Sequence, residues 1–175
     1  MRHTIAAAPA AAAAPAPALV PSAADEYYVV LPEDGRYYAF GRAKDYFDYL
    51  AHGEVTLTRA RIGAGPNGKT VVFGITNDDV KSGKPSVGEL VFDGKLPAAE
   101  GFYGEVFKDG RYYVFHDLAN MKAFAAFGEV PYSYTDIGAG PKGETLVWVM
   151  TADSFKKGRP AATIERFKQI RTASK

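Results

Sequence analysis

The sequence contains no cysteine and only three histidines. The absence of cysteine excludes disulfides, thiolate nucleophiles, cysteine-ligated zinc and iron–sulfur clusters. Three histidines leave little room for an imidazole-rich metal site, and we predict neither a metal centre nor a cofactor. A run of 18 or more strongly apolar residues is also missing, so no membrane-spanning helix is expected.

An excess of charge of one sign is missing as well. The 175 residues carry 21 Lys and Arg against 20 Asp and Glu. This balance excludes a strongly cationic surface made for polyanions as a property of the whole chain. Because 47% of the residues are hydrophobic, the chain can bury a sizeable core, and its length supports one large domain or two small ones.

The first 25 residues differ from the rest, because 12 of them are Ala and 4 are Pro. Every Tyr, Phe and Trp follows this segment, so the segment cannot bury enough surface to offset the entropy lost on ordering. We therefore predict that residues 1–25 form a low-complexity tail or tether. A secretory signal is the alternative, given the charged start Met1-Arg2-His3, but its middle is Ala and Pro rather than Leu-rich. The expected compartment is the cytoplasm, with export as the alternative.

An internal repeat with a shift of 75 positions follows the tail. The motif GRYY at residues 35–38 recurs at residues 110–113, and IGAGP at residues 62–66 recurs at residues 137–141. Under this shift, residues 34–92 need no gap and are identical to their counterparts at 24 of 59 positions. Such self-similarity indicates two copies of one structural unit.

We place the two units at residues 26–100 and 101–175. Each reads as two strands, a helix, two strands, a short capped turn and a final strand-like stretch. In the first unit, the expected elements cover residues 27–31, 36–40, a helix closed by Gly53, 55–62, 70–76 and 87–92. In the second, they cover residues 102–107, 111–115, a helix closed by Gly128, 130–137, 145–151 and 163–170. We expect an α+β fold in which two ββαββ units pack as a pseudo-twofold antiparallel sheet of about eight to ten strands with two main helices.

Residues 63–70 (GAGPNGKT) satisfy the phosphate-binding loop pattern, with Lys69 and Thr70 as the candidate phosphate ligands. In a true site a helix follows the loop, whereas the residues after Thr70 predict a strand. The second unit has Glu144 in the place of Lys69, which would repel phosphate. We therefore expect a long hairpin turn that needs glycine for positive φ, and nucleotide binding is the less favoured alternative.

The candidate catalytic residues all have ordinary structural roles. His116 beside Asp117 could form a general base, but no serine nucleophile motif accompanies the pair, and Asp117 is a plausible N-cap of the following helix. Carboxylates that could pair for acid–base chemistry each fall in a predicted turn or cap. These are Asp34, Asp78, Asp109 and Asp153. We predict no catalytic residues and a protein that is not an enzyme.

Aromatic and arginine side chains on the predicted strands are the most suggestive feature. Tyr132 and Tyr134 lie two residues apart, so they share one face of their strand. If this face is open to solvent, it suits a protein interface, where Tyr and Arg carry much of the binding energy, or the stacking of bases of single-stranded nucleic acid. If it is covered by other elements, the tyrosines belong to the core. The candidate binding residues are Tyr37, Tyr112, Tyr132, Tyr134, Arg59 and Arg61.

We predict a non-enzymatic protein-binding or assembly module, an accessory subunit of a larger complex whose N-terminal tail lies on a partner. The first alternative is single-stranded nucleic-acid binding, since the layout is similar to binders built from tandem sheet-and-helix repeats, although their strongly basic strands are missing here. The second is a small-ligand or enzyme pocket at the repeat junction. Differences between the copies, such as Lys69 against Glu144 and His116 against Gly41, would mark its active half.

Overall fold

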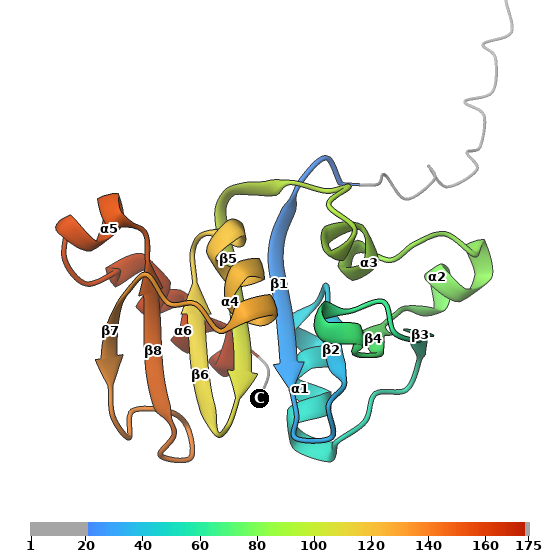
Figure 1. The fold of residues 1–175 in the computed structure, drawn as a ribbon, viewed down its shortest axis with the longest axis horizontal. Coiled ribbons are helices and arrows are strands. Elements are labelled where there is room, and N and C mark those ends of the chain that lie inside the picture. Colours follow the sequence, from blue (N-terminus) through green and yellow to red (C-terminus); the bar gives the residue numbers. More distant parts are fainter. Residues whose placement is uncertain (1–20, 174–175) are drawn as a thin grey trace, which may run out of the picture.

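The computed structural model describes residues 21–173. The Ala/Pro-rich tail predicted for residues 1–25 lies outside the described residues up to position 20, whereas Ala24 and Asp25 already belong to the first strand. The described chain has a mixed α+β fold with one eight-stranded sheet and six α-helices (Figure 1). Within residues 21–173, no helix has the length and apolar content needed to cross a bilayer.

The same order of elements, two strands, a helix, two strands and two helices, occurs first from β1 to α3 and then from β5 to α6. The strands are β1 (Ala24–Leu31), β2 (Tyr37–Phe40), β3 (Thr58–Arg61), β4 (Val71–Gly74), β5 (Ala98–Lys108), β6 (Arg111–Phe115), β7 (Tyr132–Asp136) and β8 (Thr145–Met150). The helices are α1 (Ala43–His52), α2 (Asn77–Ser82), α3 (Val87–Phe92), α4 (Leu118–Phe127), α5 (Ala152–Lys156) and α6 (Ala161–Ala173), with a short 3-10 helix, η1 (Pro66–Gly68).

The sheet is mixed rather than antiparallel throughout, which corrects the expectation from the sequence. Its strand order is β3-β4-β2-β1-β5-β6-β8-β7. The four hairpin pairs are antiparallel, but β2 with β4, β6 with β8, and β1 with β5 at the centre are parallel. The reason is the helix between β2 and β3, and likewise between β6 and β7. Such a helical crossover returns the chain so that a later strand can pair in the same direction as the earlier one.

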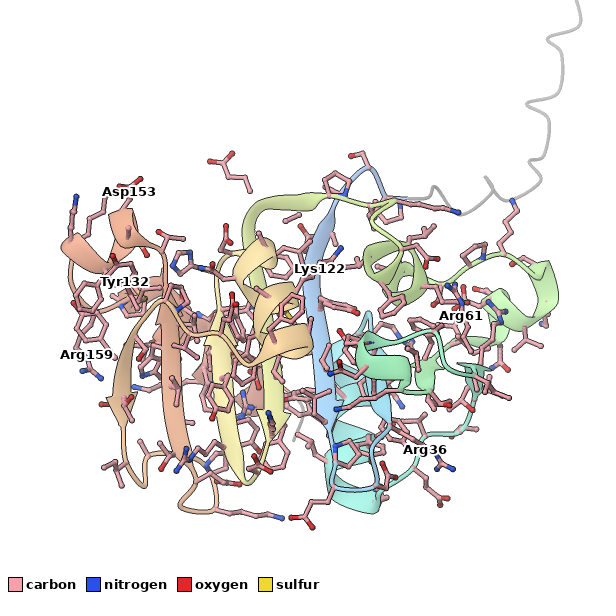
Figure 2. All side chains as sticks on the ribbon, in the orientation of Figure 1. Arg36, Arg61, Lys122, Tyr132, Asp153 and Arg159 are labelled. Atoms are coloured by element: carbon pink, nitrogen blue, oxygen red, sulfur yellow. The ribbon has the colours of Figure 1, made fainter. Side chains whose placement is uncertain are left out.

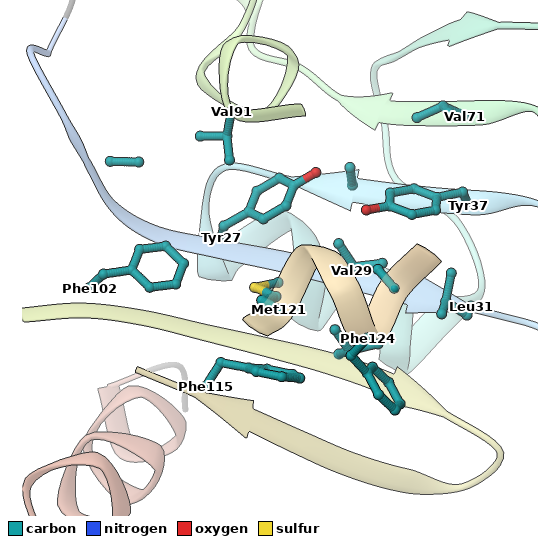
Figure 3. Close-up of a cluster of buried hydrophobic side chains, with 14 of the residues drawn as sticks. Tyr27, Val29, Leu31, Tyr37, Val71, Val91, Phe102, Phe115, Met121 and Phe124 are labelled. Atoms are coloured by element: carbon teal, nitrogen blue, oxygen red, sulfur yellow. The ribbon is translucent and has the colours of Figure 1, made fainter. Parts of the chain in front are cut away.

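Helices cover both faces of the sheet. Successive residues of a strand point to opposite faces, and on β1 Val29 belongs to one buried cluster and Val30 to another. The cluster of Val29, shown in Figure 3, is covered by Met121 and Phe124 of α4 together with α3. The cluster of Val30 is covered by α1 and α6. Each half of the chain therefore contributes one main helix to each face.

Two stretches expected as strands, residues 87–92 and 163–170, lie in the helices α3 and α6. In α3, Ser86 and Glu89 form a capping box, with Ser86 Oγ accepting from Glu89 N at 3.2 Å and the Glu89 carboxylate accepting from Ser86 N at 2.7 Å. This pairing favours a helix start and was overlooked in the sequence. In α6, apolar residues three positions apart face one cluster, as a helix requires. The expectation of two main helices was therefore wrong, since α6 has 13 residues and is the longest helix described.

The local signals, by contrast, are confirmed. Gly53 and Gly128 end α1 and α4 in the left-handed conformation, with φ of 75° and 74°, where glycine carries no Cβ penalty. Asp117 caps α4 by accepting a hydrogen bond from Asn120 N at 2.9 Å. Thr76 forms a capping box at the start of α2, where the sequence predicts a short capped turn.

Candidate functional site

The structure does not bring the four predicted tyrosines together. Tyr37 of β2 and Tyr112 of β6 are buried in the clusters on opposite faces of the sheet. Tyr134 stacks on Phe155 of α5 with ring centroids 4.9 Å apart, and its hydroxyl donates to the Phe155 carbonyl oxygen at 3.1 Å. Tyr132, at the edge strand β7, is the exposed member of the four, at 44% (Figure 2). These side chains therefore form no common platform for stacked bases.

The two predicted arginines fasten α3 to the edge strand β3. Arg59 Nη1 lies 2.7 Å from Glu89 Oε2, and Arg61 contacts both Glu89 and Asp93, the latter at 2.7 Å. The hydrogen bond from Arg61 holds the pKa of the Asp93 carboxyl below its usual value. Because both guanidinium groups are paired, they do not offer free positive charge to a polyanion.

The glycine-rich loop is the hairpin turn that the sequence predicts. It contains η1 and leads directly into the strand β4 rather than into a helix. Gly65 N donates to Lys69 O at 2.8 Å, and Gly68 N donates to Gly65 O at 3.1 Å. A phosphate-binding loop would turn such N–H groups towards its ligand, so the geometry around Lys69 and Thr70 does not favour nucleotide binding.

His116 contacts a serine that the sequence reasoning did not connect with it. His116 Nε2 lies 3.0 Å from Ser154 Oγ, which also accepts a hydrogen bond from Thr151 N at 2.9 Å. Ser154 thereby completes the capping box of α5, while Asp117 caps α4. This contact connects the start of α5 to the end of β6. The Ser154 hydroxyl is already used for hydrogen bonds that cap the helix.

A cavity of about 360 Å³ lies where α4, from the second half of the chain, packs on the first half. We call it the junction cavity. Its lining is Tyr27, Tyr37, Ala64, Gly65, Pro66, Phe92, Lys122 and Ala126. The strands β1 and β2 supply the tyrosines, the hairpin turn and α3 supply one wall, and α4 supplies the lysine. The cavity therefore has aromatic walls and few polar groups, as small-molecule sites commonly do.

The hydroxyl of Tyr27 is the unusual group in this cavity. It is buried and has no hydrogen-bond partner among the described residues. Figure 3 shows the phenol oxygens of Tyr27 and Tyr37 directed towards one another. They are too far apart for a regular hydrogen bond, but, in addition to burial, the neighbouring Tyr37 raises the pKa of Tyr27. Burial raises the pKa of Tyr37 to about 12 and that of Tyr27 well above its usual value, so both phenols are neutral at neutral pH. A buried hydroxyl without a hydrogen-bond partner lowers the stability of a protein by about 1–3 kcal/mol. A ligand atom that accepted a hydrogen bond from this hydroxyl would remove that cost.

Lys122 supplies the positive charge of the junction cavity, near the centre of the molecule (Figure 2). Burial lowers the pKa of its ammonium group, and the attraction of Asp93 opposes that shift. Asp93 is itself paired with Arg61, and Glu89 is paired with Arg59. These two acids are therefore paired with arginines, and Lys122 is the charged residue that lines the cavity itself.

A larger hollow of about 580 Å³ lies between α1 and α6, but its charged side chains have partners. Lys44 pairs with Asp48 at 3.0 Å. Glu26 accepts from Tyr28 Oη at 2.9 Å, and Arg166 lies over the ring of Tyr103. These charged side chains therefore all have partners, in contrast to the hydroxyl of Tyr27.

A cavity of about 410 Å³ lies on the α1 and α6 face, and four of its nine lining residues are 75 positions away from residues of the junction cavity. The matched pairs are Tyr37 with Tyr112, Pro66 with Pro141, Lys122 with Phe47, and Ala126 with Ala51. Arg171 lies in this second cavity. Its guanidinium carbon is 3.4 Å from the ring centroid of Phe167 and 4.8 Å from that of Tyr112. Arg171 therefore forms part of the wall of the second cavity, where its guanidinium is stacked on aromatic rings.

No family model, curated protein or solved structure matches this chain. Within residues 21–173, no three His, Asp or Glu side chains gather as metal ligands would. The sequence reasoning did not single out Tyr27 or Lys122. A signal for Lys122 was present in the sequence, because under the shift of 75 positions this lysine aligns with an aromatic residue, Phe47.

Proposed function

We propose that this protein is a non-enzymatic binding module that holds a small molecule in the junction cavity. The observation that carries the proposal is the Tyr27 hydroxyl, which is buried in the cavity wall without a partner. An apolar lining with a few convergent polar groups is the usual composition of a ligand site. Here the polar groups are this phenol and the ammonium of Lys122, between the ring of Phe92 and the hairpin turn.

We further propose that the two halves are copies of one unit, related by a pseudo-twofold axis that runs along the strands. Matched ring pairs support this relation: Tyr37 and Phe92 lie 5.6 Å apart at 72°, and Tyr112 and Phe167 lie 5.7 Å apart at 81°. Such an axis exchanges the two faces of the sheet. It accounts for the placement of α4 on one face and of α1 on the other, and for a matched cavity on each face.

The test is a ligand-observed and protein-observed NMR fragment screen on the full chain. We expect hits to perturb the resonances of Tyr27, Lys122 and Ala126, and we expect Ala126→Phe, which fills the junction cavity, to abolish their binding. The matched control is Ala51→Phe, which fills the second cavity and should leave the hits unchanged. Hits that survive Ala126→Phe, or a screen with no hit in this cavity, would overturn the proposal.

Protein binding, the function favoured by the sequence, is the second candidate. Its specific support is a pair of exposed isoleucines, Ile62 at 92% and Ile137 at 88%, which occupy matching positions of the two units. An apolar side chain that is this exposed at both matching positions contributes nothing to either core. Single exposed apolar residues are common on protein surfaces, so the support lies in the recurrence of isoleucine at the two positions. Tyr132 extends the apolar surface along the edge strand β7.

This candidate is tested by affinity capture with the full chain and with Ile62→Ser/Ile137→Ser, each with and without nuclease. A stoichiometric protein that survives nuclease and is lost with the double variant supports it, and capture that the variant does not change contradicts it. Material that is lost on nuclease treatment would instead support the nucleic-acid alternative, whose affinity should fall steeply with salt.

A further inference from the structure

The chemical class of the ligand can be inferred by comparing the two matched cavities, an inference that rests on the proposed function. In the second cavity the occupant is the planar guanidinium of Arg171, stacked on Phe167 and flanked by Phe47 at 5.2 Å. Its charge is met by the fully buried Glu105, at 2.6 Å from Arg171 Nη2. The wall of the second cavity therefore contains an aromatic site in which the chain places its own flat cation.

The junction cavity keeps the aromatic frame of this arrangement. Phe92 stands to Tyr37 as Phe167 stands to Tyr112, with closely similar centroid distances and angles. Phe92 also packs edge-on against Phe73, at 5.4 Å and 76°, as Phe167 packs against Trp148 at 5.6 Å and 80°. The ring that carries the guanidinium in one half thus has a counterpart in the other. Helix α3 ends at Phe92, whereas α6 continues past Phe167 to reach Arg171. The residue 75 positions before Arg171 is Leu96, which is buried in the cluster of Tyr37, so the first half places an apolar side chain rather than a cation at the matching position.

The charges are inverted between the two cavities. The ladder partner of Phe40 is Tyr28 and that of Phe115 is Gly104, so the next residues, Val29 and Glu105, occupy matching positions. The acid that receives a cation in the second half is therefore a valine in the first. At the same time, Lys122 stands where the second half has Phe47. Among residues 21–173, no acid lines the junction cavity, whereas an anion would find an ammonium group and the hydroxyl of Tyr27.

We propose that the junction cavity binds a small planar organic anion, with its flat body on Phe92 and its anionic group accepting hydrogen bonds from Lys122 Nζ and Tyr27 Oη. An aromatic carboxylate is the simplest member of this class. Its ring matches the aromatic walls, and its charged oxygens form stronger hydrogen bonds with an ammonium donor than a neutral acceptor does. The cavity volume of about 360 Å³ is near the lower end of ligand sites, which span about 300–1,000 Å³, so the ligand is small.

The test uses three probes of one shape, benzoate, benzamide and benzamidine, which are negative, neutral and positive at neutral pH. In NMR titrations of the full chain we expect benzoate to bind about tenfold more tightly than benzamide, the size of effect that one charge-assisted hydrogen bond provides. Benzamidine should not perturb the cavity. Lys122→Met should remove the preference for benzoate and leave benzamide unchanged, and Lys142→Met, in the second cavity, should change neither.

Each other outcome contradicts a different part of the reasoning. Equal binding of the three probes would overturn the anion class and leave the proposed ligand site standing. Preferential binding of benzamidine would show that the junction cavity shares the cation preference of its counterpart. If none of the probes binds while the fragment screen yields neutral hits in the cavity, the class is wrong; if the screen yields none, the proposed function fails with it.

Discussion

Arg171 and Glu105 form a bidentate ion pair that fastens the last helix to the centre of the sheet. Arg171 Nη1 donates to Glu105 Oε2 at 2.8 Å, and Nη2 donates to Oε1 at 2.6 Å. The Glu105 carboxylate is fully buried and also accepts hydrogen bonds from Tyr46 of α1 and Tyr103 of β5. One acid in the middle of β5 therefore connects α1, α6 and the sheet.

Removing the arginine should destabilise the protein strongly. Arg171→Met leaves the Glu105 carboxylate buried without its counter-ion, and losing one member of a buried pair costs about 3–5 kcal/mol. In that background Glu105→Gln should restore stability, because the side chain is then uncharged, its oxygen can still accept from one tyrosine, and its amide nitrogen can donate to the hydroxyl oxygen of the other. In the unmodified chain the same Glu105→Gln should be destabilising, since it orphans the arginine. The measurement is the free energy of unfolding in urea for the unmodified chain, the two single variants and the double variant. The effect of Glu105→Gln should change sign between the two backgrounds, and two destabilising effects that simply add would contradict this prediction.

Tyr27→Phe should have the opposite effect on stability. Its hydroxyl is buried without a partner, so removing it relieves a desolvation penalty of about 1 kcal/mol or more. The free protein should become more stable, while benzoate binding weakens several-fold because a donor is lost. The matched control is Tyr46→Phe, which removes a hydroxyl bonded to Glu105 at 2.9 Å and should destabilise. A loss of stability in Tyr27→Phe would show that this hydroxyl has a partner, such as a trapped water.

Acid should weaken the fold through two ion-paired carboxylates. A hydrogen bond from Arg61 lowers the pKa of Asp93, and one from Trp148, reinforced by Arg159, lowers that of Asp136. A group whose pKa is lower in the folded state adds stability that is complete above its ordinary value of 3.8 and is lost as the pH falls through the folded-state pKa. The urea concentration at the midpoint of unfolding should therefore decrease as the pH is lowered below about 4. Asp93→Asn and Asp136→Asn should each make this decrease with pH less steep. If neither variant changes the steepness, these two carboxylates are not its source.

The elements that could be predicted from the sequence are those specified by neighbouring residues. The turn between β1 and β2, the helix ends at Gly53 and Gly128, and the cap at Asp117 all depend on contacts within a few positions. The parallel pairings were not predicted, because they join strands separated by a helix or by the whole first unit. Nothing in the local pattern of Ala24–Leu31 indicates that it pairs with β5.

The candidate site was harder to predict than the fold, for a related reason. Tyr37 was selected as a candidate binding residue, and it is buried at the wall of a cavity that α4 closes from the second half of the chain. Whether a strand tyrosine is open or covered depends on which helix lies over it. That placement follows from the parallel pairing of β1 and β5, which decides which helix from the other half covers each face. The comparison of Lys122 with Phe47 becomes informative only once both are known to line matched cavities.

Replacing the two exposed isoleucines should weaken binding through this surface without changing the stability of the fold. Ile62 and Ile137 are 92% and 88% exposed, so Ile62→Ser/Ile137→Ser removes no core contact and should change the free energy of unfolding by less than about 0.5 kcal/mol, as surface substitutions do. Any self-association of the full chain, measured by sedimentation velocity over a range of concentrations, should decrease because apolar surface is lost. A loss of stability larger than about 1 kcal/mol would mean that the isoleucines are covered in the folded protein in solution. In that case the surface that covers them, whether the N-terminal segment or a second copy, becomes the contact to identify.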